Sequence, residues 1–212
     1  MSTSCCQTEP KFSGASQAFK RALWAVIGIN AAMFVIEMSA GALAGSQALQ
    51  ADALDFLGDT MTYGLSLYVI GKSVRARTAA ALIKGFSLAA LGTWVLGSTI
   101  YKVFFIGVPQ AEIMGIVGFL ALAANIASVM LLLRFRDGDA NVRSVWLCSR
   151  NDAIGNVAVI AAASGVWASS TGWPDLAVAG AMASLFLWSA VQIVRQAFQE
   201  FRACDTFAVA VD

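Results

Sequence analysis

The chain has 212 residues, of which 58% are hydrophobic and only 13% are charged, and its mean hydropathy is +0.71. Soluble domains carry about 25% charged residues, so this composition indicates a membrane protein. The net charge of +1 gives no reason to expect a nucleic-acid partner, and the absence of histidine excludes every catalytic or metal site built on imidazole.

Residues 1–19 are polar, and their one chemical feature is the pair Cys5 and Cys6. We expect a flexible cytoplasmic leader here, because terminal segments of this kind seldom pack. The two cysteines are either free thiols or a weak capture site for a soft metal ion, and Cys204, after the last apolar stretch, is a third such thiol. The leader lacks the charged-then-apolar pattern of a signal peptide, so the first apolar stretch is expected to stay in the membrane.

Six stretches are apolar and long enough to cross a bilayer, which takes roughly 20 residues in a helix. The sequence therefore predicts an all-α membrane protein with six transmembrane helices over residues 20–202, followed by a short tail at 203–212. Gly-Val-Pro at 107–109 separates the third span from the fourth, and Gly-Trp-Pro at 172–174 separates the fifth from the sixth. The predicted spans are 20–44, 49–72, 79–106, 110–134, 143–168 and 174–200.

The lysines and arginines orient these spans. They precede the first span, lie between the second and third and between the fourth and fifth, and close the sixth, whereas the other three loops contain neither residue. By the positive-inside rule, both termini are predicted to be cytoplasmic in a multi-pass protein of the inner (plasma) membrane. Lys102, near the outer end of the third span, is the exception, and we expect its amine to reach outward to water.

The second predicted span contains Asp52, Asp55 and Asp59 at positions i, i+3 and i+7, which share one face of a helix. Acidic residues in a lipid-spanning helix are costly, so they usually face the interior of a bundle and mark an ion or proton pathway. Asp52 lies near the outer mouth. Glu37, in the first span, is a further candidate to line this pathway or to take up a proton.

The fifth predicted span contains Cys148 and Asp152, one helical turn apart. Asp59 and Asp152 each fall about ten residues into their spans, close to the middle of the bilayer. We therefore predict that the two helices meet and hold a divalent metal ion with Asp55, Asp59, Cys148 and Asp152. Three oxygens and one sulfur suit tetrahedral Zn²⁺, and the softer Cd²⁺ at least as well.

Two structural alternatives stay open for these residues. Buried cysteine often serves only as a small apolar side chain, so Cys148 need not be a ligand. A single aspartate in a membrane helix can also pair with a cation such as Arg150 or Lys84. Three aspartates at helical spacing in one span exceed what pairing with the local cations explains.

Exchange of metal for protons follows from the acid–base chemistry of these ligands. Carboxylate and thiolate must be deprotonated to bind metal, so metal binding expels protons and protonation expels metal. Without histidine, the carboxyl and thiol groups themselves would carry the exchanged protons. The chain has no glycine-rich ATP-binding loop, so the proton gradient is the expected energy source, and no organic cofactor is expected.

Over about 22–200, the sequence resembles the cation diffusion facilitator family. The resemblance is carried by Gly-Ser-Gln-Ala-Leu-Gln-Ala-Asp-Ala at 45–53, by Asn-Val-Arg-Ser at 141–144, and by Asp-Ala-Ile-Gly-Asn at 152–156. Asp55 and Asp59 follow the first of these pieces, and Cys148 lies between the other two. Pro-Asp at 174–175, and Glu37 followed by Gly41, are also similar to the family.

The resemblance implies a homodimeric six-helix carrier that exports zinc-like divalent ions from the cytoplasm in exchange for protons. In this family an Asp or His and an Asp, four residues apart, form the metal site on each of the second and fifth helices. Asp55 and Asp59 match the first pair, and Cys148 and Asp152 match the second, with sulfur in place of the usual His or Asp. The family's cytoplasmic domain does not follow in residues 203–212, so self-association is expected through the membrane helices.

Other functions remain open from the sequence alone. One alternative is a membrane metal sensor or scaffold that binds metal without moving it across the bilayer. A metal-dependent intramembrane hydrolase is a third possibility, although it would need a general base and a nucleophile beside the metal, without histidine. For a carrier, uptake rather than export is also compatible with the sequence.

Overall fold

The computed structural model describes residues 17–68, 74–105, 107–135 and 140–209, and these residues form six α-helices and no strand. The predicted all-α fold class and the number of helices are thereby confirmed. Each predicted span falls on one helix, whereas Cys5 and Cys6 lie outside the described residues. The helices are α1 (Gln17–Ala44), α2 (Gln47–Tyr68), α3 (Val74–Phe104), α4 (Ala111–Leu133), α5 (Ala140–Ser169) and α6 (Trp173–Val209).

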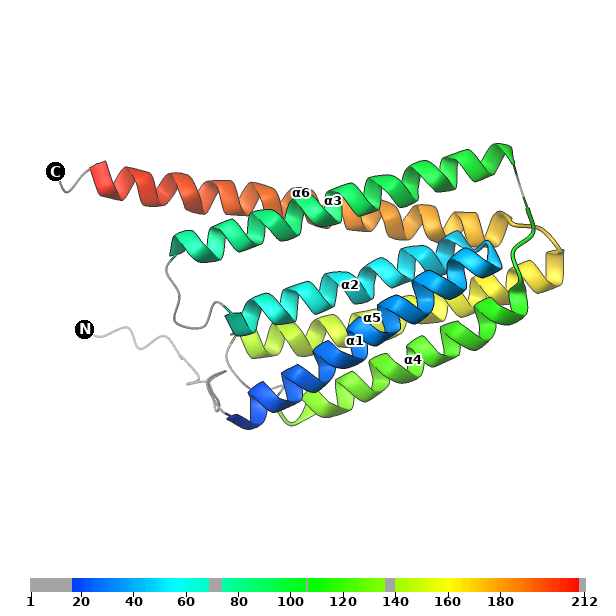
Figure 1. The fold of residues 1–212 in the computed structure, drawn as a ribbon, viewed down its shortest axis with the longest axis horizontal. Helices are drawn as coiled ribbons and strands as arrows, with labels where there is room; N and C mark the ends of the chain where they lie inside the picture. The colour runs from blue at the N-terminus through cyan, green and yellow to red at the C-terminus, as the bar shows by residue number, and fades with distance from the viewer. Residues whose placement is uncertain (1–16, 69–73, 106, 136–139, 210–212) are drawn as a thin grey trace, which may run out of the picture.

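The helices α1, α2, α4 and α5 form a bundle, and α3 and α6 run as a pair along one side of it (Figure 1). The paired helices reach the bundle mainly through α2, which also contacts α1 and α5. The start of α1 and the end of α6 lie toward the same end of the molecule (Figure 1). We call this the terminal end and the opposite one the distal end.

Small residues allow α3 to approach α6 closely. A Cβ atom added to Gly85 would lie only 2.7 Å from Cγ2 of Val194, and one added to Gly92 would lie 3.3 Å from Cδ2 of Leu187. The two glycines are seven residues apart and therefore share a helix face. Such close backbone approach is the usual way in which helices associate in lipid, where no hydrophobic force drives them together.

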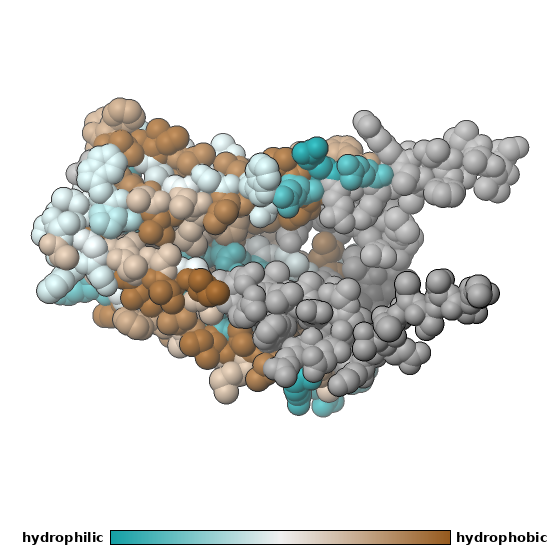
Figure 2. Space-filling model, turned by 180° about the vertical axis from the view of Figure 1, so that it is seen from behind, coloured by the Kyte–Doolittle hydropathy of each residue, from teal (hydrophilic) through white to brown (hydrophobic). Residues whose placement is uncertain are grey.

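The surface of the described part suits a lipid environment. Every helix exposes large hydrophobic side chains, among them Trp24, Phe86, Ile116 and Trp188, and Figure 2 shows hydrophobic residues over much of the coloured surface. Soluble monomers rarely expose apolar patches beyond a few hundred Å². The molecule is therefore a multi-pass membrane protein.

Four stretches of the described residues are long and apolar enough to span a membrane by themselves: Gln17–Ala44, Ala111–Leu133, Asp152–Ser169 and Trp173–Arg195. The predicted second span is not among them, because all 18-residue stretches of the 22-residue helix α2 contain Asp52, Asp55 and Asp59. The search for spanning stretches covers only the residues whose side chains are described, and several side chains near the start of α3 are not among them. The charge of α2 therefore needs an explanation from its neighbours.

The turn between α1 and α2 satisfies the backbone groups at both helix ends. Gly45 adopts φ 71°, a conformation that glycine allows without strain, and Ser46 N donates to Gly41 O at 2.9 Å in a Schellman arrangement. Nζ of Lys102 donates to Gly45 O at 2.7 Å. The amine, which we expected to reach outward, points to this turn at the distal end and binds its carbonyl, so Lys102 joins the end of α3 to the end of α1.

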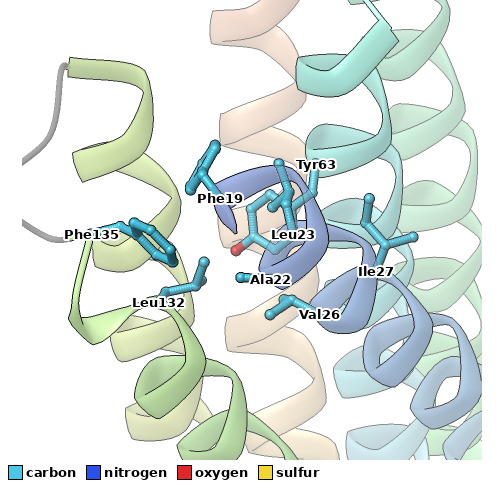
Figure 3. Packing of buried hydrophobic residues seen from close by; sticks show 8 residues of the cluster. All are labelled: Phe19, Ala22, Leu23, Val26, Ile27, Tyr63, Leu132 and Phe135. Atoms are coloured by element: carbon cyan, nitrogen blue, oxygen red, sulfur yellow. The ribbon is translucent and has the colours of Figure 1, made fainter. Parts of the chain in front are cut away.

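Two apolar clusters close the bundle at its two ends. The terminal cluster joins α1, α2 and the end of α4, with the rings of Phe19 and Phe135 edge to face at 5.4 Å (Figure 3). The distal cluster joins α2, α4 and α5 around Leu49 and Met114. The polar residues of the bundle lie between them. The terminal cluster consists of Phe19, Ala22, Leu23, Val26, Ile27, Tyr63, Leu132 and Phe135, and the distal cluster of Leu49, Met114, Val159, Ala162, Ala163 and Val166.

Candidate functional site

Three carboxyl groups meet where α2 packs against α5. Asp55 and Asp59, one turn apart on α2, each make hydrogen-bonding contact with the carboxyl of Asp152 on α5. All three residues are half-buried. The structure thus brings together the three aspartates in which we expected a metal site, from helices far apart in the sequence.

This carboxyl cluster needs a cation. Oδ2 of Asp152 is buried and receives no hydrogen bond from the described residues. Ionised carboxylates in a low-dielectric interior are strongly destabilised unless protons, cations or metal ions balance them. No group of three or more Asp, Glu or Cys among the described side chains is already arranged to hold a metal ion. Metal binding here would therefore require the side chains to rearrange around the ion.

The sulfur of the predicted site lies outside the described residues. Cys148 belongs to α5, one turn before Asp152, but its side chain is not among those described, and the same holds for Cys204 in α6. The side chains of Arg150 and Lys84, the alternative partners of the aspartates, are also outside this part. A thiolate ligand at Cys148 remains a prediction.

Glu37 and Asp52 form a second carboxyl pair, between α1 and α2. Their side chains are only 0% and 1% exposed and make hydrogen-bonding contact with each other. Both were predicted to line the ion pathway or to take part in proton transfer. The structure shows them in contact with each other, where α1 packs on α2.

Asp175 holds the distal end of α2, a role that the sequence pattern did not reveal. Its carboxylate accepts hydrogen bonds from Ser46 Oγ at 2.6 Å, from Gln47 N at 2.8 Å and from Ala48 N at 3.0 Å. Ser46 Oγ in turn accepts from Leu49 N at 3.1 Å, as an N-cap residue does. A carboxylate at a helix N-terminus is also favoured by the helix dipole.

This clamp fixes how α2 presents its acidic residues. On the α3 side, Ser98 Oγ donates to the side-chain oxygen of Gln47 at 2.6 Å, so α2 is anchored to both α3 and α6. Asp55 follows Gln47 by eight residues and Asp59 by twelve. Anchoring the first turn therefore sets both the depth and the rotation of these two carboxyls relative to α5.

Buried amides accompany the carboxyl cluster. The side chains of Asn125 on α4 and Asn156 on α5 lie 3.0 Å apart, within hydrogen-bonding distance, and Asn156 is one turn from Asp152. Asn30 on α1 is also buried, and neither atom of its amide has a partner among the described residues. The interior of the bundle is thus polar at this level and apolar toward both ends.

Comparison with known proteins agrees with this architecture. The family described as the cation efflux transmembrane domain matches residues 23–201. The chain is also 29% identical over 168 residues to zinc transporter ZitB of Escherichia coli (strain K12) and to that of Shigella flexneri. In both cases the alignment covers 73% of this chain and 52% of the relative, so the chain spans about half the length of these curated relatives. Because the family match covers most of the chain, this protein belongs to the cation efflux, or cation diffusion facilitator, family.

Proposed function

We propose that this protein exports divalent transition-metal ions, Zn²⁺ and also Cd²⁺, from the cytoplasm in exchange for protons. The contact of Asp55, Asp59 and Asp152 between α2 and α5 is the observation that carries this proposal. Carboxylate oxygens are ligands for both metal ions and protons, and in this cluster either one balances the same charge. Competition between them is the chemical basis of exchange.

The residues of the cluster have the properties that a transported substrate requires. They are half-buried, so an ion can reach them without the whole bundle opening. Three carboxylates leave one position of a tetrahedral Zn²⁺ site free, and Cys148 is our candidate for the fourth ligand. A sulfur ligand would favour soft ions, which is why we include Cd²⁺.

The relatives and the fold also support a transport function in a membrane. The curated relatives are named as zinc transporters, not as enzymes. The start of α1 and the end of α6 lie at one end of the molecule, as an even number of spans requires. We place this terminal end in the cytoplasm from the distribution of lysine and arginine, and we place the protein in the inner membrane as a dimer formed through its membrane helices.

Zinc flux into proteoliposomes tests the proposal. Asp59→Asn and Asp152→Asn preserve side-chain size but remove the charge, and each is expected to lower zinc flux at least tenfold. Glu112→Gln is the matched control, because Glu112 is exposed at the start of α4, away from the cluster. Zinc flux at the parental rate in both aspartate variants would refute the proposed site. Zinc binding to the parent without flux would instead indicate a sensor or scaffold.

A further inference from the structure

Glu37 and Asp52 lie in contact inside the bundle, and three of their four carboxyl oxygens have no hydrogen-bond donor among the described residues. Both oxygens of Glu37 and Oδ2 of Asp52 are buried and receive no hydrogen bond from an N–H or O–H group of the described residues. The two carboxyls nevertheless make hydrogen-bonding contact with each other. Two oxygen acceptors can share such a contact only if a proton lies between them.

The packing on both sides encloses this pair. Toward the distal end, Gly41 lies so close to α2 that an added Cβ would be 3.1 Å from Leu49 Cβ. Toward the terminal end, Met33 and Phe56 are buried in one cluster, and each is four residues from its own acid. The Glu37–Asp52 pair is therefore enclosed between two levels at which α1 packs closely on α2, one at Gly41 and Leu49 and the other at Met33 and Phe56.

The charged groups around the pair increase its need for a proton. Asp55, one turn from Asp52 on α2, is also acidic and adds negative charge near Glu37. On α3, Lys102 donates a hydrogen bond to the carbonyl of Gly45. On α6, Asp175 accepts hydrogen bonds from the first turn of α2. On α4 and α5, the charged groups described are Glu112, which is exposed, and Asp152, which belongs to the carboxyl cluster. None of these supplies a positive charge to the pair.

The number of ligands that Glu37 and Asp52 supply decides which cation they can hold. A divalent metal ion would need four or more ligands, and the pair supplies two carboxyls in direct contact, with exposed fractions of 0% and 1%. A proton needs no further ligand. Carboxyl pairs this close retain a proton because two like charges at hydrogen-bonding distance cannot both ionise.

We propose that Glu37 and Asp52 bind a proton between them, at a site separate from the metal ligands, and that this proton is part of the counter-ion. The second half of the proposal rests on the proposed transport function, whereas the first half does not. Since α2 carries Asp52 as well as Asp55 and Asp59, a movement of α2 would change proton binding and metal binding together.

Infrared spectroscopy of the purified protein tests the proton site without any transport. The carboxyl groups of the proposed metal site all belong to aspartates, so selective ¹³C labelling of glutamate side chains separates Glu37 from them. At neutral pH we expect the C=O band of a protonated glutamate, shifted by the label, present in Glu112→Gln and absent in Glu37→Gln. Asp52→Asn should displace this band, because it changes the partner of Glu37. The lack of a protonated glutamate band, or a band unaffected by Asp52→Asn, would overturn the proposal.

Zinc flux with and without an opposing pH gradient tests the coupling. We expect Glu37→Gln to retain zinc flux down a zinc gradient but to lose its acceleration by the pH gradient, and Glu37→Asp to restore part of it. An acceleration equal to that of the parent in Glu37→Gln would refute the coupling role. Lack of zinc flux in the parent would refute the proposed function instead, and the infrared result would still decide the proton site.

Discussion

Replacing Asp175 by alanine is expected to release the distal end of α2 from α6. The substitution removes three hydrogen bonds to a carboxylate that is only 2% exposed. It also leaves the backbone N–H groups of Gln47 and Ala48 buried without their acceptor. The change therefore removes both the cap and the partner that ties α2 to α6.

The magnitude follows from these contacts. A hydrogen bond to a charged group contributes about 1.5–3 kcal/mol, and a buried donor left unsatisfied costs about 1–3 kcal/mol. These contributions overlap because they involve the same atoms, so we expect Asp175→Ala to lower the free energy of unfolding by about 3–5 kcal/mol. Asp175→Asn keeps one side-chain oxygen as acceptor and should cost roughly half as much.

Unfolding in mixed micelles with increasing SDS, followed by circular dichroism, measures these changes. Ser184→Ala is the matched control on α6, because this exposed hydroxyl bonds only to Gly180 O of its own helix, and its effect should stay within about 0.5 kcal/mol. A double-mutant cycle with Ser46→Ala should give a coupling of about 1–3 kcal/mol with Asp175. An Asp175→Ala variant within about 1 kcal/mol of the parent would show that the clamp does not stabilise α2.

Three further substitutions have defined outcomes. Lys102→Met leaves the turn carbonyl between α1 and α2 without its donor, and it should reduce stability by about 1–2 kcal/mol in the same unfolding assay, whereas a result equal to the parent contradicts a stabilising bond. Gly85→Ala places a Cβ against Val194 and should cost about 1–3 kcal/mol, while Gly64→Ala, with open space around it, should cost nothing comparable. Cys148→Ser should reduce cadmium flux more than zinc flux in proteoliposomes, and equal reductions would show that the sulfur is not a ligand.

The sequence predicts well what depends on local pattern. Hydropathy predicts the helices because each span must bury its own backbone hydrogen bonds, and length and composition alone suffice for the most apolar of them but not for α2. The spacing of Asp55 and Asp59 places both on one helix face for the same local reason. Their contact with Asp152 could be anticipated only from matching depths in antiparallel spans.

Long-range partners could not be read from the sequence in this way. Ser46 is recognisable as an N-cap residue, but its bond to Asp175 joins positions 129 residues apart, and no local pattern encodes that pairing. Lys102 was expected to reach outward, but its partner there, the carbonyl of Gly45 in the turn between α1 and α2, could not be identified from the sequence. Glu37 was recognised as a buried acid, yet its pairing with Asp52 depends on how closely Gly41 lets the two helices approach.

These features indicate that the position of α2 determines the geometry of both the carboxyl cluster and the Glu37–Asp52 pair. This helix packs on α1, α3, α5 and α6, more partners than a helix at the edge of a bundle has. With 3.6 residues per turn, a rotation by one residue would displace Asp52 from Glu37, and Asp55 and Asp59 from Asp152, at the same time. The clamp at Asp175 resists such a rotation at one end of the helix, and the carboxyl contacts respond to it further along. In the proposed mechanism, proton uptake by Glu37 and Asp52 and metal release from Asp55, Asp59 and Asp152 are coupled through one rigid helix, which needs no chain of intermediate residues between the two sites.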